Sequence, residues 1–125
     1  MEPTVEQLAS AITDRPRPML VVADVPATVA WYRGLGFRVV QTHDDDFAIV
    51  ALGAGDVMIS AGACQPTTDA VRLWFYTGAV DDLYRAIKTR GIPVRFVEDI
   101  YDPFYGGRQF SIEDPNGVHL VFYRP

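Results

Sequence analysis

Two side chains in the second half of the chain are candidates for proton transfer. His119 follows the turn sequence DPNG in a stretch that alternates as in a strand, and a histidine titrates near neutral pH. A partly buried histidine that is hydrogen-bonded to a neighbour is the favoured alternative, because the sequence places no catalytic partner beside it. Tyr76 is the second candidate for a catalytic acid or base.

Two further side chains have reactive or metal-binding chemistry. His43 precedes three aspartates in the segment QTHDDDF, a composition that could bind a metal ion, but the same residues are typical of a turn, and the turn is favoured. Cys64 lies in a segment rich in Gly, Pro and Thr without a base or a positive charge beside it, so an incidental thiol is favoured over a nucleophile. A single cysteine excludes an internal disulfide.

The composition indicates one folded domain and argues against several functional classes. Of the 125 residues, 49% are hydrophobic and 22% are charged, which argues against disorder. No apolar run reaches the roughly 20 residues of a membrane-spanning helix, and the N-terminus lacks the blocks of a secretory signal. The net charge is −5 with no basic segment, so nucleic-acid binding is not expected. We expect a cytoplasmic protein without a membrane partner.

Hydrophobic periodicity predicts the elements that must position these residues. Val5, Leu8 and Ile12 follow a helical period before two prolines, so residues 1–16 are expected to form a helix and a linker. Two similar series follow, each with a strand, a helix and three more strands. The first comprises strand 19–24, helix 25–34 and strands 37–42, 47–52 and 56–62; the second comprises strand 72–77, helix 79–91 and strands 93–98, 107–114 and 118–124.

The two series match in register as well as in order. When Gly36 is aligned with Gly91, the apolar faces of the two predicted helices coincide. These faces are Val25, Thr28, Val29 and Tyr32 in the first helix and Val80, Leu83, Tyr84 and Ile87 in the second. Both follow the spacing of a helix packed on a sheet. The pattern therefore predicts a duplicated βαβββ unit.

Two segments resemble a known superfamily. LVVADVPATVAWYRGLGF is similar to the first strand and helix of the glyoxalase/bleomycin-resistance/extradiol-dioxygenase (vicinal oxygen chelate) superfamily, and GGRQFSIEDPNGVHLVF is similar to its closing hairpin. The resemblance implies an α+β fold in which tandem βαβββ modules form a curled mixed sheet around a cavity, assembled as a homodimer. One domain is expected over residues 17–125, with the first module at 17–63 and the second at 70–125.

The resemblance also implies where related enzymes would bind a divalent metal. Carried onto this sequence, the four ligand positions are Arg17, Ser60, Arg72 and Val121. Arginine offers no lone pair, valine has no donor atom and a lone serine hydroxyl is a poor ligand, whereas a catalytic ion needs about three His, Asp, Glu or Cys ligands. We therefore expect no metal and no cofactor, and metal-dependent glyoxalase or dioxygenase activity is disfavoured.

The sequence does not decide whether Arg17 and Arg72 give the cavity a positive charge. They occupy related positions in the two modules, and together they could hold a carboxylate or a phosphate. Each lies near the start of a strand, however, so exposure to solvent or pairing with nearby acidic residues is equally favoured.

Aromatic side chains give the main indication of a binding site. Alternation places Trp74 and Tyr76 on one face of their strand and Phe75 on the other, so the first two are expected to line the cavity. Rings with a few polar groups suit a flat organic molecule. The expected ligand-binding residues are Met58, Ser60, Arg72, Trp74, Tyr76, Tyr101, Phe104, Tyr105, His119 and Val121. For the three aromatic residues of the segment YDPFYGG, a dimer interface is an equal alternative.

The resemblance and the aromatic set favour a metal-independent small-molecule-binding protein of the bleomycin-resistance type. Such a protein sequesters an aromatic or amphipathic compound, such as an antibiotic, without breaking a bond. The alternative is a metal-independent isomerase, cyclase or lyase of the same fold that acts on a natural-product or metabolic intermediate, with His119 or Tyr76 as acid or base. A third interpretation is an accessory or regulatory subunit without ligand chemistry.

Overall fold

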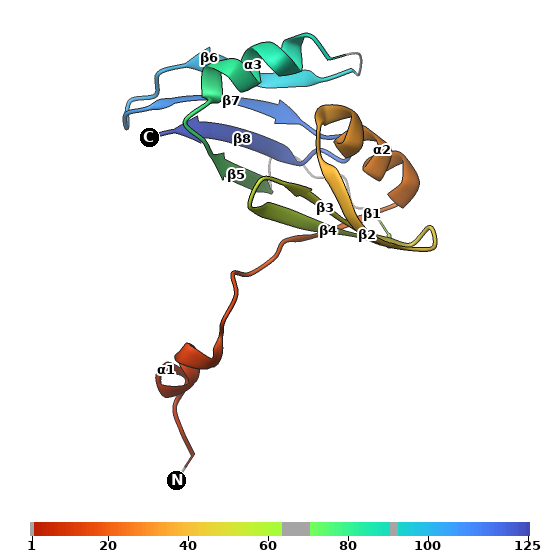
Figure 1. The fold of residues 1–125 in the computed structure, drawn as a ribbon, viewed down its shortest axis with the longest axis vertical. Coiled ribbons are helices and arrows are strands. Elements are labelled where there is room, and N and C mark those ends of the chain that lie inside the picture. Colours follow the sequence, from red (N-terminus) through yellow and green to blue (C-terminus); the bar gives the residue numbers. More distant parts are fainter. Residues whose placement is uncertain (1, 64–70, 91–92) are drawn as a thin grey trace.

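Two modules with the same order of elements form the molecule (Figure 1). The computed structural model describes residues 2–63, 71–90 and 93–125. The first module contains β1 (Met19–Val22), α2 (Val25–Leu35), β2 (Arg38–His43), β3 (Phe47–Leu52) and β4 (Gly55–Ala61). The second contains β5 (Arg72–Tyr76), α3 (Val80–Lys88), β6 (Arg95–Tyr101), β7 (Arg108–Glu113) and β8 (His119–Arg124). The predicted α+β fold of tandem βαβββ modules is confirmed.

Each module forms a four-stranded mixed sheet. The strand orders are β1-β4-β3-β2 and β5-β8-β7-β6. In both sheets the first strand pairs in parallel with the last strand of its module, and the other pairs are antiparallel. A parallel pair needs a long crossover, which the helix and the two intervening strands provide.

Strand β6 is longer and less regular than the sequence predicts. The predicted strand covers 93–98, whereas β6 begins at Arg95 and ends at Tyr101. The register of pairing with β7 shifts between Phe96 and Glu98 and again between Glu98 and Tyr101, which marks β-bulges. Tyr101 therefore belongs to a strand and not to the glycine-containing loop that follows it.

Helix α2 begins and ends where local signals predict. The Asp24 side chain accepts a hydrogen bond from the Ala27 amide at 3.0 Å and caps the first turn. Gly36 follows the helix with φ at 124°, a backbone conformation that favours glycine. The buried face consists of Val25, Thr28, Tyr32 and Leu35. In α3, Val80 and Ile87 are buried, as the repeat predicts.

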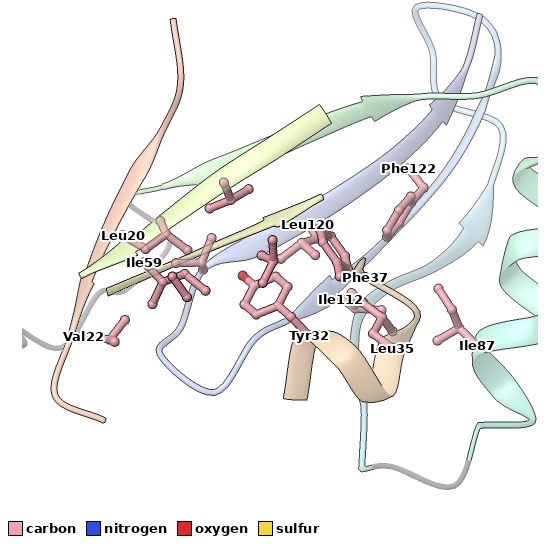
Figure 2. Close-up of a cluster of buried hydrophobic side chains, with 14 of the residues drawn as sticks. Leu20, Val22, Tyr32, Leu35, Phe37, Ile59, Ile87, Ile112, Leu120 and Phe122 are labelled. Atoms are coloured by element: carbon pink, nitrogen blue, oxygen red, sulfur yellow. The ribbon is translucent and has the colours of Figure 1, made fainter. Parts of the chain in front are cut away.

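The two modules share one hydrophobic core (Figure 2). The ring of Phe37 in the first module lies 4.9 Å from that of Tyr32 and 5.9 Å from that of Phe75 in the second module. Phe75 in turn stacks on Phe122 at 5.3 Å. Aromatic pairs of this kind contribute about 0.5–1.5 kcal/mol each beyond their buried area. We therefore expect the modules to unfold together.

The DPNG turn of the second module is hydrogen-bonded to α2 of the first module. Asp114 accepts hydrogen bonds from the amides of Asn116 and Val118 at 2.8 and 2.9 Å. It also accepts one from the Tyr32 hydroxyl at 2.7 Å, and the Asn116 side chain donates to the Thr28 hydroxyl at 3.1 Å. Burial raises the pKa of both Asp114 and Tyr32. The turn thus joins the two modules.

The first residues of the chain extend away from both sheets (Figure 1). The predicted N-terminal helix is present as α1 (Val5–Leu8), followed by the 3-10 turn η1 (Ala9–Ala11). Thr4 and Gln7 form a capping box at its start, and its apolar side chains are exposed. Among the described residues, no helix has both the length and the apolar character needed to cross a membrane.

Candidate functional site

Three aromatic side chains meet on the face of the second sheet opposite the core residue Phe75. Trp74 and Tyr76 project from β5 and Tyr123 projects from β8. The ring of Tyr123 lies 5.7 Å from that of Trp74 and 5.6 Å from that of Tyr76. Trp74 is 41% exposed and Tyr76 is 70% exposed. Both rings therefore offer accessible surface to a ligand.

The segment between β6 and β7 adds further rings to this face. The Tyr105 ring lies 5.9 Å from that of Tyr123, and the Phe104 ring lies 5.2 Å from that of Tyr105. Phe104 is fully exposed. We call Trp74, Tyr76, Tyr105 and Tyr123 the aromatic face.

A close approach of two backbone segments holds Tyr105 against β8. The Tyr123 hydroxyl donates to the Gly106 carbonyl oxygen at 2.9 Å. At Gly107 φ is 80°, and a Cβ would lie 2.2 Å from the Arg124 carbonyl oxygen. A side chain at Gly107 would therefore force the backbone to shift. The position of Tyr105 depends on this glycine.

Ion pairs fix the two ends of the segment between β6 and β7. Arg108 binds Asp102 at 2.8 Å and Asp81, in the first turn of α3, at 2.9 Å. Arg124 binds the other oxygen of Asp81 at 3.2 Å. The hydrogen bond from Arg108 lowers the pKa of the Asp81 carboxyl. These contacts connect α3, β7 and β8 to the segment that bears Tyr105.

A carboxylate lies beside the aromatic face on the bulged strand β6. Glu98 accepts hydrogen bonds from the Ser111 hydroxyl at 3.1 Å and from the Tyr101 hydroxyl at 3.0 Å. The Gln109 side chain donates to Glu98 at 3.3 Å and accepts from the Tyr105 hydroxyl. Gln109 and Ser111 are both buried. A chain of hydrogen bonds therefore links the carboxylate to the aromatic face.

Among the described residues, Glu98 has no cationic neighbour that would balance its charge. The groups that donate to it are two hydroxyls and an amide, and within the described ranges it forms no ion pair. Desolvation and the hydrogen bond to Glu98 raise the pKa of Tyr101 to about 12, so this hydroxyl stays protonated at neutral pH. A carboxylate next to aromatic rings suits a positively charged or hydrogen-bond-donating group.

His119 lies on β8 beside an acidic residue that sequence reasoning did not identify. Its Nε2 is 3.4 Å from the carboxylate of Glu113, its cross-strand neighbour. Glu113 also binds Arg95 at 2.7 Å. On the other side, Arg72 is the cross-strand neighbour of His119 on β5. Because His119 is only 9% exposed, little of its imidazole reaches the open face.

The four positions implied as metal ligands do not fit a divalent ion. Arg17 lies before β1, where its Nε is 3.4 Å from Asp56, and Val121 is buried. Ser60 and Arg72 belong to different sheets. Arginine, valine and a serine hydroxyl give no adequate donor set. Over the part of the chain that the structure describes, no group of three or more His, Cys, Asp or Glu side chains could hold a metal ion.

Three other sequence candidates belong to the first sheet, whereas the aromatic face lies on the second. Met58 and Ser60 project from β4 of the first sheet. His43 ends β2 at the predicted hairpin turn, and its Nδ1 lies 3.2 Å from Asp46. Cys64 falls outside the described residues.

A cavity lies between β5 and the start of β4, and Trp74 of the aromatic face is among the residues that line it. Its volume is about 350 Å³, and the linker 14–18 forms one of its walls. Arg17 and Arg72 both line it. Arg17 thus lines this cavity and also approaches Asp56.

Comparison with known proteins identifies the family. The sequence model of the Glyoxalase/Bleomycin resistance protein/Dioxygenase superfamily matches residues 15–122. The chain belongs to this superfamily. The family resemblance noted in the sequence is thereby confirmed, and most of the N-terminal helical segment lies outside the match. Comparison with curated protein sequences gives no significant match.

Solved structures show how widely this superfamily fold is shared. A bleomycin resistance determinant encoded on the transposon Tn5 superposes with a TM-score of 0.76 at 24% identity, over 90% of this chain and 98% of that chain. A bleomycin-binding protein complexed with bleomycin gives 0.73 at 23% identity, over 90% and 99%. A lactoylglutathione lyase from Agrobacterium tumefaciens gives 0.68 at 20% identity, over 90% and 93%. At such identities the likeness shows a common fold.

Sequence reasoning missed the polar half of the site in this superfamily member. On β7, Gln109 and Ser111 alternate with the buried Phe110 and Ile112, and this alternation could have placed them on the same side as the aromatic residues. Glu98 carries no comparable signal, because the bulges of β6 change the face that it occupies.

Proposed function

We propose that the protein is a metal-independent binding protein that sequesters an aromatic or amphipathic compound, such as an antibiotic, without changing it. The observation that carries the proposal is the gathering of four aromatic side chains on one open face beside Glu98. The similar fold of a bleomycin-binding protein solved with bleomycin supports it.

Aromatic rings and a carboxylate would contact different parts of such a ligand. A planar body would stack on Trp74 and Tyr76, the neighbouring exposed rings of β5. A positively charged end would lie near Glu98, where Tyr105 and Tyr101 belong to the same hydrogen-bond network. A cation over an aromatic ring gains about 0.5–2 kcal/mol, depending on its desolvation.

The proposal includes a homodimer that works in the cytoplasm. Phe104, between β6 and β7, is fully exposed, and Met19 and Val21 on β1 are 48% and 50% exposed. Apolar side chains of both modules therefore stay uncovered in a single chain. A second copy would cover part of this surface. The single cysteine is in keeping with a reducing compartment. Sedimentation velocity measures the assembly directly.

A thermal-shift series with chelator present tests ligand binding. The probes are 2-naphthylmethylamine, which is cationic at neutral pH, and the neutral 2-naphthylmethanol. A ligand at 100 times its Kd adds about 2.7 kcal/mol of stability. We expect the amine to stabilise the protein more than the alcohol does, and its Kd to rise about tenfold or more in Glu98→Gln and in Tyr105→Ala.

Glu6→Gln is the matched control, since Glu6 lies on the exposed N-terminal segment. Sequestration also requires that the amine be recovered unchanged by chromatography after long incubation. If neither probe shifts the melting temperature, or if Glu98→Gln and Glu6→Gln bind the amine equally well, the proposed site is wrong.

A metal-independent isomerase, cyclase or lyase is the second candidate. The observation that favours it is the 3.4 Å contact between His119 and Glu113, which would orient the imidazole. Conversion of a bound compound with chelator present, lost in His119→Ala and retained in Glu6→Gln, would replace sequestration with catalysis. The exposed Tyr76 is tested in the same way with Tyr76→Phe.

A further inference from the structure

The cavity between β5 and the start of β4 is lined with arginines. Its volume is about 350 Å³, and its walls come from the linker, from the start of β4 and from β5. Arg15, Arg17 and Arg72 line it, against two acidic residues, Asp14 and Asp56. Positive side chains therefore exceed negative ones around this space, although the whole chain is acidic.

Two of these guanidinium groups remain open to an anion. Within residues 2–63, 71–90 and 93–125, the Arg15 side chain forms no ion pair. Arg17 approaches Asp56 through Nε at 3.4 Å, which leaves its terminal nitrogens for a bidentate contact. Pro16 and Pro18 fix the backbone φ angle on either side of Arg17. The linker therefore loses little conformational freedom when a ligand binds.

The arginine-lined cavity continues into an apolar hollow. A second space of about 330 Å³ shares with it Arg15, Ala54, Gly55, Trp74 and Phe75. The apolar side chains that line this second space include Leu52, Leu83 and Phe122. We call the two connected spaces the arginine groove. It has a cationic end at the linker and an apolar end at the edge of the shared core.

We propose that the arginine groove binds an amphipathic organic anion. Its carboxylate, sulfate or phosphate group would contact Arg15 and Arg17, because a guanidinium group matches such oxygens with paired hydrogen bonds. Its apolar body would lie against Leu83 and the exposed ring of Tyr76. The arginine groove shares Trp74 and Tyr76 with the aromatic face, but its charged end lies at the linker and selects the opposite charge from Glu98. The proposal does not rest on the function proposed above.

Isothermal titration calorimetry with 2-naphthoate tests the proposal. The variants are Arg15→Gln, Arg17→Gln and the matched control Arg38→Gln, since Arg38 is exposed on β2 and lines neither space. We expect Kd to rise about tenfold in each of the first two variants, because each loses a charge-assisted contact. Arg38→Gln should bind as the wild type does.

A second variant tests the groove without removing a charge. Ala54 is exposed in the turn between β3 and β4 and lines both spaces, so Ala54→Phe should fill the groove and weaken naphthoate binding while the fold is kept. Circular dichroism checks the fold. Arg15→Gln removes no ion pair that the described residues form, so it too should fold normally.

Three outcomes overturn the proposal. The first is that naphthoate does not bind, and the second is that it binds Arg15→Gln and Arg38→Gln with the same Kd. The third is that inorganic phosphate binds as tightly as naphthoate. The last result would mean that the apolar end contributes nothing. Glu98→Gln should leave naphthoate binding unchanged, so a failure of the arginine groove is distinguishable from a failure of the aromatic face.

Discussion

Glu98 differs from Glu113 and Asp81 in the groups that surround it. Glu113 and Asp81 are bound by arginines, whereas Glu98 is held by hydroxyl and amide donors. Neutral donors orient a carboxylate without cancelling its charge. Glu98 can therefore attract a cation, while Glu113 and Asp81 serve to join strands and a helix.

The Tyr101 hydroxyl is expected to titrate well above an ordinary tyrosine. Its pKa is raised to about 12, and the pKa of Tyr32 is raised as well. Spectrophotometric titration should show two late tyrosines in the wild type and one in Tyr101→Phe. Since the folded state favours the neutral phenol, its contribution to stability is present below about pH 10, the ordinary pKa of a tyrosine, and is lost as pH rises toward 12.

The same titration in denaturant gives the reference, where all tyrosines should ionise together. If Tyr101→Phe and the wild type titrate identically in the folded state, the raised pKa does not belong to Tyr101. The hydrogen bond to Glu98 would then not be the one that holds this proton.

At the scale of elements, the segment 102–107 between β6 and β7 is fixed at both of its ends. Arg108 connects Asp102, at its start, to α3. Gly106 and Gly107, at its end, lie against β8. A loop fixed in this way presents Tyr105 with little loss of entropy on binding. The aromatic face therefore depends on contacts that lie outside it.

Gly107→Ala should move this segment, whereas Gly106→Ala should not. Both residues have positive φ, at 80° and 94°, so both substitutions carry backbone strain of about 1 kcal/mol. Only at Gly107 would the new Cβ meet backbone, 2.2 Å from the Arg124 carbonyl oxygen. We expect Gly107→Ala to weaken binding of 2-naphthylmethylamine about tenfold more than Gly106→Ala does, as measured by calorimetry. Equal losses in both variants would mean that strain alone matters.

The sequence predicts the elements well because their signals are local. The cap at Asp24 and the glycine after α2 lie within a few residues of the structure that they specify. The bulges in β6 are different, because they exist only through pairing with β7. Simple alternation puts Phe96 and Glu98 on one face, but the bulge between them pairs Phe96 with a core residue and Glu98 with the polar Ser111. For this reason the sequence does not predict that Glu98 belongs to the site.

At the scale of the whole molecule, one hydrogen-bonded turn joins the two modules. The contacts of Asp114 with Tyr32 and of Asn116 with Thr28 connect β8 to the helix of the other module. The sequence shows the turn and the helix separately. Their contact depends on how the modules pack, which no local pattern encodes.

Tyr32→Phe should destabilise the protein, whereas Tyr84→Phe should have little effect. Removing the Tyr32 hydroxyl leaves a carboxylate oxygen of the buried Asp114 without its donor, at a cost of about 1–3 kcal/mol. The Tyr84 hydroxyl binds Asp99 at an exposed site, where water can replace it, so a change within about 0.5 kcal/mol is expected. Urea denaturation measures both.

A single transition is expected in each case, because the modules share a core. Two separate transitions in Tyr32→Phe would show that this contact, and not the ring contacts of Phe37 and Phe75, makes the modules cooperate.

The strand order has a consequence for the chain while it is being made. Strand β5 leaves the ribosome before α3, β6 and β7, yet the strand beside it in the sheet is β8. Until β8 emerges, Trp74 and Tyr76 have no Tyr123 to contact, and pairing over such a distance along the chain is slow. A nascent polypeptide that already carries a finished first sheet therefore lacks the complete aromatic face, which forms only when β8 has been translated.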